Sequence, residues 1–119
     1  MRDHRQLRAF QLADELALIV YKVTRNFPSD ELYGLRSQIR RSAVSVPSNI
    51  VEGCGRPSQT EYFRFLDIAF GSLRELTYQL ELSHRLGFLD EADWINCESK
   101  LTETDKVLVA LIRSKRNSS

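Results

Sequence analysis

Cysteine, proline, glycine and histidine are all scarce in this chain of 119 residues, which contains two, three, five and two of them. The cysteines, Cys54 and Cys97, show no Cys-x-x-Cys or Cys-x-x-His spacing, so neither a disulfide framework nor a zinc site is expected. No apolar run approaches the roughly 20 residues that cross a bilayer. Since no signal-peptide pattern occurs either, we expect reduced thiols in a cytoplasmic protein without membrane contact.

Charge is nearly balanced, because seventeen basic and sixteen acidic residues leave a formal net charge of +1. Such a chain exerts no overall attraction on nucleic acid. The charges are nevertheless distributed unevenly. Nine basic residues stand against six acidic ones up to Ser58, and eight stand against ten after it. The first part of the chain is thus net basic and the second part net acidic.

Apolar residues recur at three- and four-residue intervals in four segments, which is the pattern of amphipathic helices. Pro28 follows the first segment, Gly53 ends the second, Ser58 and Glu61 form a capping box before the third, and Gly87 ends it. The expected helices cover about residues 7–26, 30–53, 59–86 and 91–114. Short connections and the lack of an alternating strand pattern predict one all-α domain over residues 1–119, an antiparallel up-down-up-down four-helix bundle.

The second expected helix contains a proline. Pro47 has no amide hydrogen to donate to the carbonyl oxygen of Ala43, so the sequence predicts a kink in the helix at this position. Ser45, Ser48 and Asn49 are the nearby side chains that can satisfy the backbone groups that the kink leaves without partners.

The third expected helix is apolar nearly all round. Between Tyr62 and Leu73 its only charged residues are Arg64 and Asp67. One bundle core needs a stripe of a little over 100°, so the excess predicts contact with another copy of the chain. The expected interface residues are Tyr62, Phe65, Ile68, Ala69 and Ser72. The alternative is that this helix is simply wrapped by the three others.

A longer motif runs through the sequence. It comprises Phe27-Pro28, Tyr33-Gly34-Leu35, Gln38-Ile39-Arg40-Arg41 and Ser45 through Gly53, followed by Arg56, Phe65-Leu66 and Gly71-Ser72-Leu73. With these residues the chain resembles the four-helix-bundle family of 23S rRNA-intervening sequence proteins over nearly its whole length. The resemblance implies a homo-oligomer, with family members described as ring-like pentamers, and no known catalytic activity. The chain is also similar to the accessory protein of diversity-generating retroelements, which implies contacts with nucleic acid and a reverse transcriptase through a basic surface.

Four arginines stand out in the second segment and just after it. Arg36 and Arg40 are four residues apart and share a helix face, Arg41 lies one position round, and Arg56 follows the helix end. Such a cluster can contact several phosphates of RNA or DNA, each contact steepening the salt dependence of binding. The alternative is that these arginines pair with carboxylates across the bundle or between subunits.

Two polar residues beyond the proline predict a structural role. Asn49 and Glu52 are three residues apart on one helix face, and we expect Glu52 to form a buried ion pair with Arg41 or Arg74. A catalytic carboxylate would need a second carboxylate, a histidine or a metal ion beside it, and the sequence specifies none.

Other reactive groups are isolated. Glu81 and His84 have the Glu-x-x-His spacing of di-iron bundles, but a full site requires a second such motif, and the only other histidine is His4. Cys54 has no histidine near it in the sequence, and a helix C-terminus raises the pKa of a thiol. We therefore expect no metal, no cofactor and no enzymatic activity.

These patterns favour a non-catalytic, self-assembling bundle that binds structured RNA or DNA through exposed arginines. The alternative is a protein-interaction scaffold whose apolar third helix and oligomer surface recruit another protein.

Overall fold

The computed structural model describes residues 2–117, and the side chains of residues 2–114. It contains four long helices, which confirms the prediction of an all-α four-helix bundle: α1 (Arg8–Val23), α2 (Leu35–Cys54), α3 (Gln59–Arg85) and α4 (Glu91–Asn117). Short 3-10 turns at His4–Gln6 and Ser29–Glu31 precede α1 and α2. In the part of the chain described there is no strand.

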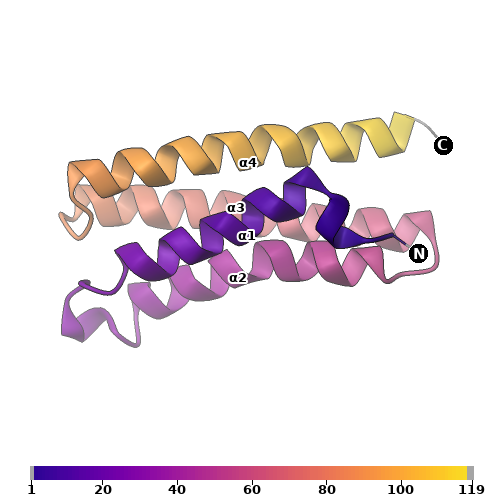
Figure 1. The fold of residues 1–119 in the computed structure, drawn as a ribbon. Helices are drawn as coiled ribbons and strands as arrows, with labels where there is room; N and C mark the ends of the chain where they lie inside the picture. The colour runs from indigo at the N-terminus through magenta and orange to yellow at the C-terminus, as the bar shows by residue number, and fades with distance from the viewer. Residues whose placement is uncertain (1, 118–119) are drawn as a thin grey trace.

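Each of the four long helices contacts two others, so that the contacts form a closed cycle. α1 packs on α2, α2 on α3, α3 on α4, and α4 returns to α1. The bundle measures 46 × 24 × 20 Å. Consecutive helices run in opposite directions along its long axis, and the beginning of α1 and the end of α4 lie at the same end (Figure 1).

Capping residues explain several helix ends. The hydroxyl oxygen of Ser58 accepts a hydrogen bond from the amide of Glu61 at 3.1 Å, and Asp90 accepts one from the amide of Asp93 at 2.8 Å. Gly87 adopts a φ of 82° after the end of α3, a conformation that favours glycine. α2 begins five residues later than expected, because the 3-10 turn intervenes and Glu31 caps the amide of Leu35 at 2.9 Å.

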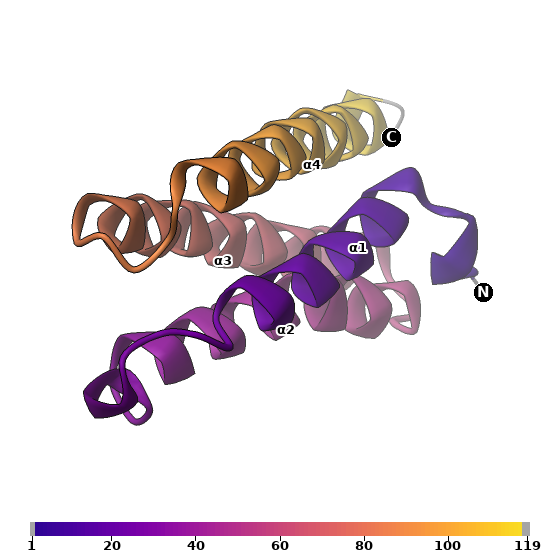
Figure 2. The ribbon, with the colours of Figure 1, turned by 60° about the vertical axis from the view of Figure 1, so that its left-hand side comes forward.

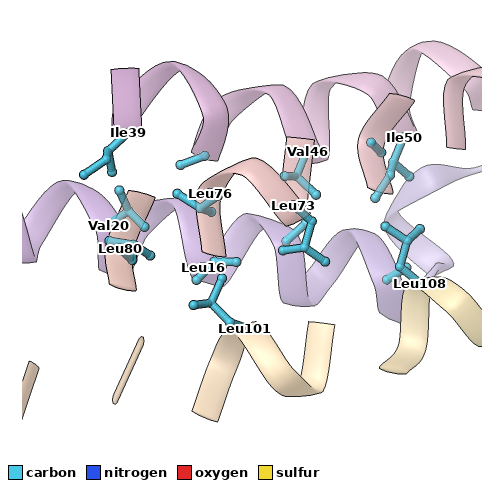
Figure 3. Packing of buried hydrophobic residues seen from close by; sticks show 14 of the residues in the cluster. Leu16, Val20, Ile39, Val46, Ile50, Leu73, Leu76, Leu80, Leu101 and Leu108 are labelled. Atoms are coloured by element: carbon cyan, nitrogen blue, oxygen red, sulfur yellow. The ribbon is translucent and has the colours of Figure 1, made fainter. Parts of the chain in front are cut away.

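Leucine, isoleucine and valine side chains from all four helices fill the centre of the bundle (Figure 3). They include Leu16, Val20, Ile39, Val46, Ile50, Leu73, Leu76, Leu80, Leu101 and Leu108, all of them buried. Full burial of one such side chain stabilises the folded state by about 1.5–3 kcal/mol. The bundle is therefore held together mainly along its central axis.

α2 continues through its proline. Pro47 is buried inside the helix, and the side chain of Asn49 donates a hydrogen bond to the carbonyl oxygen of Ser45 at 2.8 Å. Asn49 thus forms side-chain hydrogen bonds within α2, but to Ser45 and not to the carbonyl oxygen of Ala43, the group that Pro47 leaves without its helical donor. The kink itself stays a prediction.

The expected interface residues of the third helix divide into two groups. Tyr62, Phe65 and Ala69 are buried within the single chain, so the prediction that they contact another copy is wrong. The reason is that α3 packs on both α2 and α4, so apolar side chains are needed over a wide part of its circumference. This agrees with the alternative, in which the third helix is wrapped by the others of its own chain. Ile68 is 40% exposed, and Ser72 is half-buried with its hydroxyl oxygen 2.8 Å from that of Ser45.

A candidate binding groove between helices α1 and α2

Three of the four arginines singled out from the sequence lie together. An open groove of about 510 Å³ runs between the last turns of α1 and the first half of α2. We call it the arginine groove and define it by Tyr21, Leu32, Arg36, Arg40, Arg41 and Val44. Arg56 is not part of it, because it follows the opposite end of α2 and lines a separate depression with Arg2.

Arg40 is held in place by α1. Its Nε donates a hydrogen bond to the hydroxyl oxygen of Thr24 at 2.9 Å, and its Nη2 donates one to the carbonyl oxygen of Tyr21 at 3.1 Å. The guanidinium also lies over the Tyr21 ring, 4.5 Å from its centroid. Burial, and after that the charge of Arg36, lowers the pKa of Arg40, which still carries its charge at neutral pH. Arg40 therefore joins the two walls of the groove and also contributes charge to it.

Arg36 and Arg41 have fewer contacts with the chain. The Nε of half-buried Arg36 is shielded from solvent and has no hydrogen-bond partner among the described residues, and Arg41 is exposed. Within the described side chains, no carboxylate lies within 4.0 Å of a basic nitrogen of Arg36, Arg40 or Arg41. The idea that these three arginines pair across the bundle is therefore wrong, and none of the described acidic residues lines the groove.

The remaining walls of the arginine groove are apolar. Tyr21 is 41% exposed, and Leu32 and Val44 are each 42% exposed. Sequence analysis did not identify these three residues. Tyr21 and Val44 lie outside the buried apolar faces of their helices. An apolar residue at such an outward position was the sequence signal that could have identified them. The arginine groove thus offers both charge and apolar surface to an occupant.

The fourth arginine is already paired. Arg56 Nη2 lies 2.6 Å from Glu52 Oε1, and the side chain of Glu52 is 52% exposed. The expectation that Glu52 forms a buried pair with Arg41 or Arg74 is therefore wrong. The physical reason is that Glu52 and Arg56 are one helical turn apart, so that Arg56 is the cation closest to this carboxylate. An exposed pair of this kind stabilises a helix by only about 0.3–0.5 kcal/mol.

Residues 5–110 match the family model described as 23S rRNA-intervening sequence protein. The chain belongs to this family. It is similar to a crystal structure of a protein with unknown function from the S23 ribosomal protein family of Bacteroides thetaiotaomicron VPI-5482, with 25% sequence identity and a TM-score of 0.79. The similarity covers 88% of this chain and 95% of that one. None of the curated proteins matches the chain.

A second depression on this family member is polar. It lies between α2 and α3, has a volume of about 460 Å³, and is lined by Arg41, Ser42, Ser45, Ser72, Glu75 and Gln79. The hydroxyl of Ser42 donates a hydrogen bond to Glu75 at 2.9 Å. Arg41 lines both this depression and the arginine groove.

The reactive side chains do not come together. His84 Nε2 lies 3.0 Å from Glu91, and its ring stacks on Trp94 with centroids 5.1 Å apart. Among the described residues, no three His, Cys, Asp or Glu side chains are grouped so that they could hold a metal ion. Burial raises the pKa of Cys54 and raises that of Cys97 to about 11. Both thiols are consequently protonated near neutral pH, the unreactive form.

Hydropathy gives no membrane span: within the described part of the chain, each helix is too polar or too short to cross a bilayer.

Proposed function

We propose that this family member is a non-catalytic, self-assembling bundle, and that the arginine groove binds a protein segment carrying both carboxylates and apolar side chains. One observation carries the proposal. Three arginines that form no ion pair within 4.0 Å among the described side chains share the groove with Tyr21, Leu32 and Val44, which are partly exposed. An occupant that supplies anions and apolar side chains together would satisfy both kinds of wall.

Structured RNA or DNA is the second candidate occupant. In its favour, three arginines and, within the described part of the chain, no acidic residue line the groove, and arginine forms strong bidentate contacts with phosphate. Against it, a phosphate backbone would leave Leu32 and Val44 without an apolar partner. The overall charge of +1 also adds little attraction for a polyanion. A protein segment therefore fits the groove better.

Val44→Glu tests the proposal. It removes apolar surface from the groove and adds a carboxylate that can form ion pairs with the arginines of the same chain. We expect self-association, followed by sedimentation over a range of protein concentrations, to weaken by about tenfold or more. Ser48→Glu is the matched control, since Ser48 is exposed on the same helix outside the groove. The proposal fails if Val44→Glu and the parent protein assemble equally.

A titration with labelled duplex DNA and hairpin RNA at low and physiological salt tests the second candidate. Binding that falls steeply with salt, and that Val44→Glu weakens while Ser48→Glu does not, would replace the protein segment with nucleic acid. Equal binding by the two variants would place any contact with nucleic acid outside the groove.

A further inference from the structure

Helix α4 has an acidic face with one exposed aliphatic side chain. Glu91, Ile95 and Glu98 follow one another at intervals of four and three residues, so they share a face of the helix. Ile95 is 57% exposed, and both glutamates are exposed. We call these three residues the α4 stripe. An isoleucine between two carboxylates has the composition that the arginine groove requires of an occupant.

We infer that the arginine groove of one copy receives the α4 stripe of a second copy. This inference rests on the proposed function and names the partner. Ile95 would enter between Leu32 and Val44, while Glu91 and Glu98 would meet Arg36 and Arg41. At 1.5 Å per residue, the two glutamates are about 10 Å apart along their helix and the two arginines about 8 Å along theirs. The long side chains can take up this difference.

The same chain cannot make this contact with itself. α4 packs on α1 and α3, and within the described residues it makes no contact with α2 (Figure 2). Glu98 lines a depression between α3 and α4, whereas the groove lies between α1 and α2. The two surfaces therefore lie on different sides of the bundle, and the arginines can reach the stripe only in another molecule.

The stripe is available for such a contact. Glu91 lies 3.0 Å from the Nε2 of His84, but its side chain is 72% exposed, so this pair is a weak surface contact that can be exchanged for an arginine. Ile95 is not among the side chains that pack against the core. Little of the chain's own structure would be lost on docking.

The contact joins two different surfaces and is therefore heterologous. Each copy would offer its groove to one neighbour and its stripe to another, which generates a closed ring or an open filament according to the angle between successive copies. A closed ring fills both surfaces of every copy, whereas a filament leaves one surface empty on the copy at each end.

A charge swap tests the inference. Arg41→Glu and Glu98→Arg should each weaken self-association about tenfold or more in sedimentation experiments, because each places like charges opposite one another. The double variant, with both changes in one chain, should recover most of the loss, because the pair is restored with opposite polarity. Melting curves of each variant check that the bundle is intact.

Two control variants separate the loss of this contact from the effect of a change in net charge elsewhere on the surface. Arg113→Glu makes the same change in net charge as Arg41→Glu at an exposed position of α4 remote from the groove. Asn96→Arg adds a cation to α4 on another side of the helix. Both should assemble as the parent does.

The outcomes distinguish the inference from the proposal beneath it. If Val44→Glu dissociates the assembly while Glu98→Arg has no effect, the groove is an interface and the α4 stripe is not its occupant. If Arg41→Glu weakens assembly and Glu98→Arg fails to restore it, the inference is also overturned. A parent protein that stays monomeric at every concentration overturns both.

Discussion

The two ends of α2 both carry arginine, but they differ in what surrounds the charge. At the beginning of the helix, Arg36, Arg40 and Arg41 face an open groove that no acidic residue among those described lines. At the other end, Arg56 is paired with Glu52 at 2.6 Å. The N-terminal segment covers this second end, since Arg2 donates a hydrogen bond to the carbonyl oxygen of Arg56 at 3.0 Å.

Packing differs between the two ends as well. Arg2 lies 4.0 Å above the centre of the Tyr62 ring, and a Cβ added to Gly53 would come within 2.9 Å of the Cβ of Phe65. The groove end instead leaves Val44 and Leu32 partly uncovered. Arg56 thus finds an acid in the helical turn before it, whereas the arginines of the groove have no such partner among the described side chains and the elements around them leave the surface open.

The largest expected effect on stability concerns the end of α2 at Gly53 and Arg56, which we call the closed end. Gly53→Ala should lower the free energy of unfolding by about 1–3 kcal/mol in urea denaturation, because the new methyl group would overlap Phe65 and force α2 and α3 apart. Gly71→Ala is the matched control, since nothing lies within 4 Å of a Cβ at Gly71. It should raise the free energy of unfolding by about 0.5–1 kcal/mol through helix propensity. Equal effects of the two changes would show that the closed end is not tightly packed.

A medium effect separates two adjacent arginines at the open end. Arg40→Ala should lower the free energy of unfolding by about 1–2 kcal/mol, because Thr24 and the carbonyl oxygen of Tyr21 lose charged donors. Arg41→Ala should change it by less than about 0.5 kcal/mol, because Arg41 is exposed. Urea denaturation of both variants measures the difference. If Arg41→Ala were the more destabilising change, Arg40 would not be what joins α1 to α2.

The four-helix bundle could be predicted from the sequence because the signals that place its helices are local. Apolar spacing, the Ser58 cap and the left-handed Gly87 each depend on a few neighbouring residues, and all three agree on where helices lie. Which face of α3 is buried depends instead on how many helices surround it, so Tyr62 and Ala69 were misplaced. The grouping of Arg36, Arg40 and Arg41 followed from helical spacing. The contributions of Tyr21 and Leu32 come from other segments, and no spacing within α2 could reveal them.

The smallest expected effect concerns the pair at the closed end. Glu52→Gln removes the partner of Arg56 and should lower the free energy of unfolding by no more than about 0.5 kcal/mol at low salt, because both side chains are partly in water. Added salt screens exposed charges, so the difference from the parent should disappear in concentrated sodium chloride.

The effect of Glu52→Gln on self-association distinguishes the two ends of α2 more sharply than its effect on stability. Glu52→Gln leaves Arg56 without its carboxylate, yet self-association should not change, because this arginine lies outside the groove. Sedimentation of Glu52→Gln beside the parent measures this directly. A gain in assembly, or in binding to nucleic acid, would mean that freeing an arginine is enough to create a binding surface and that the apolar walls of the groove are dispensable.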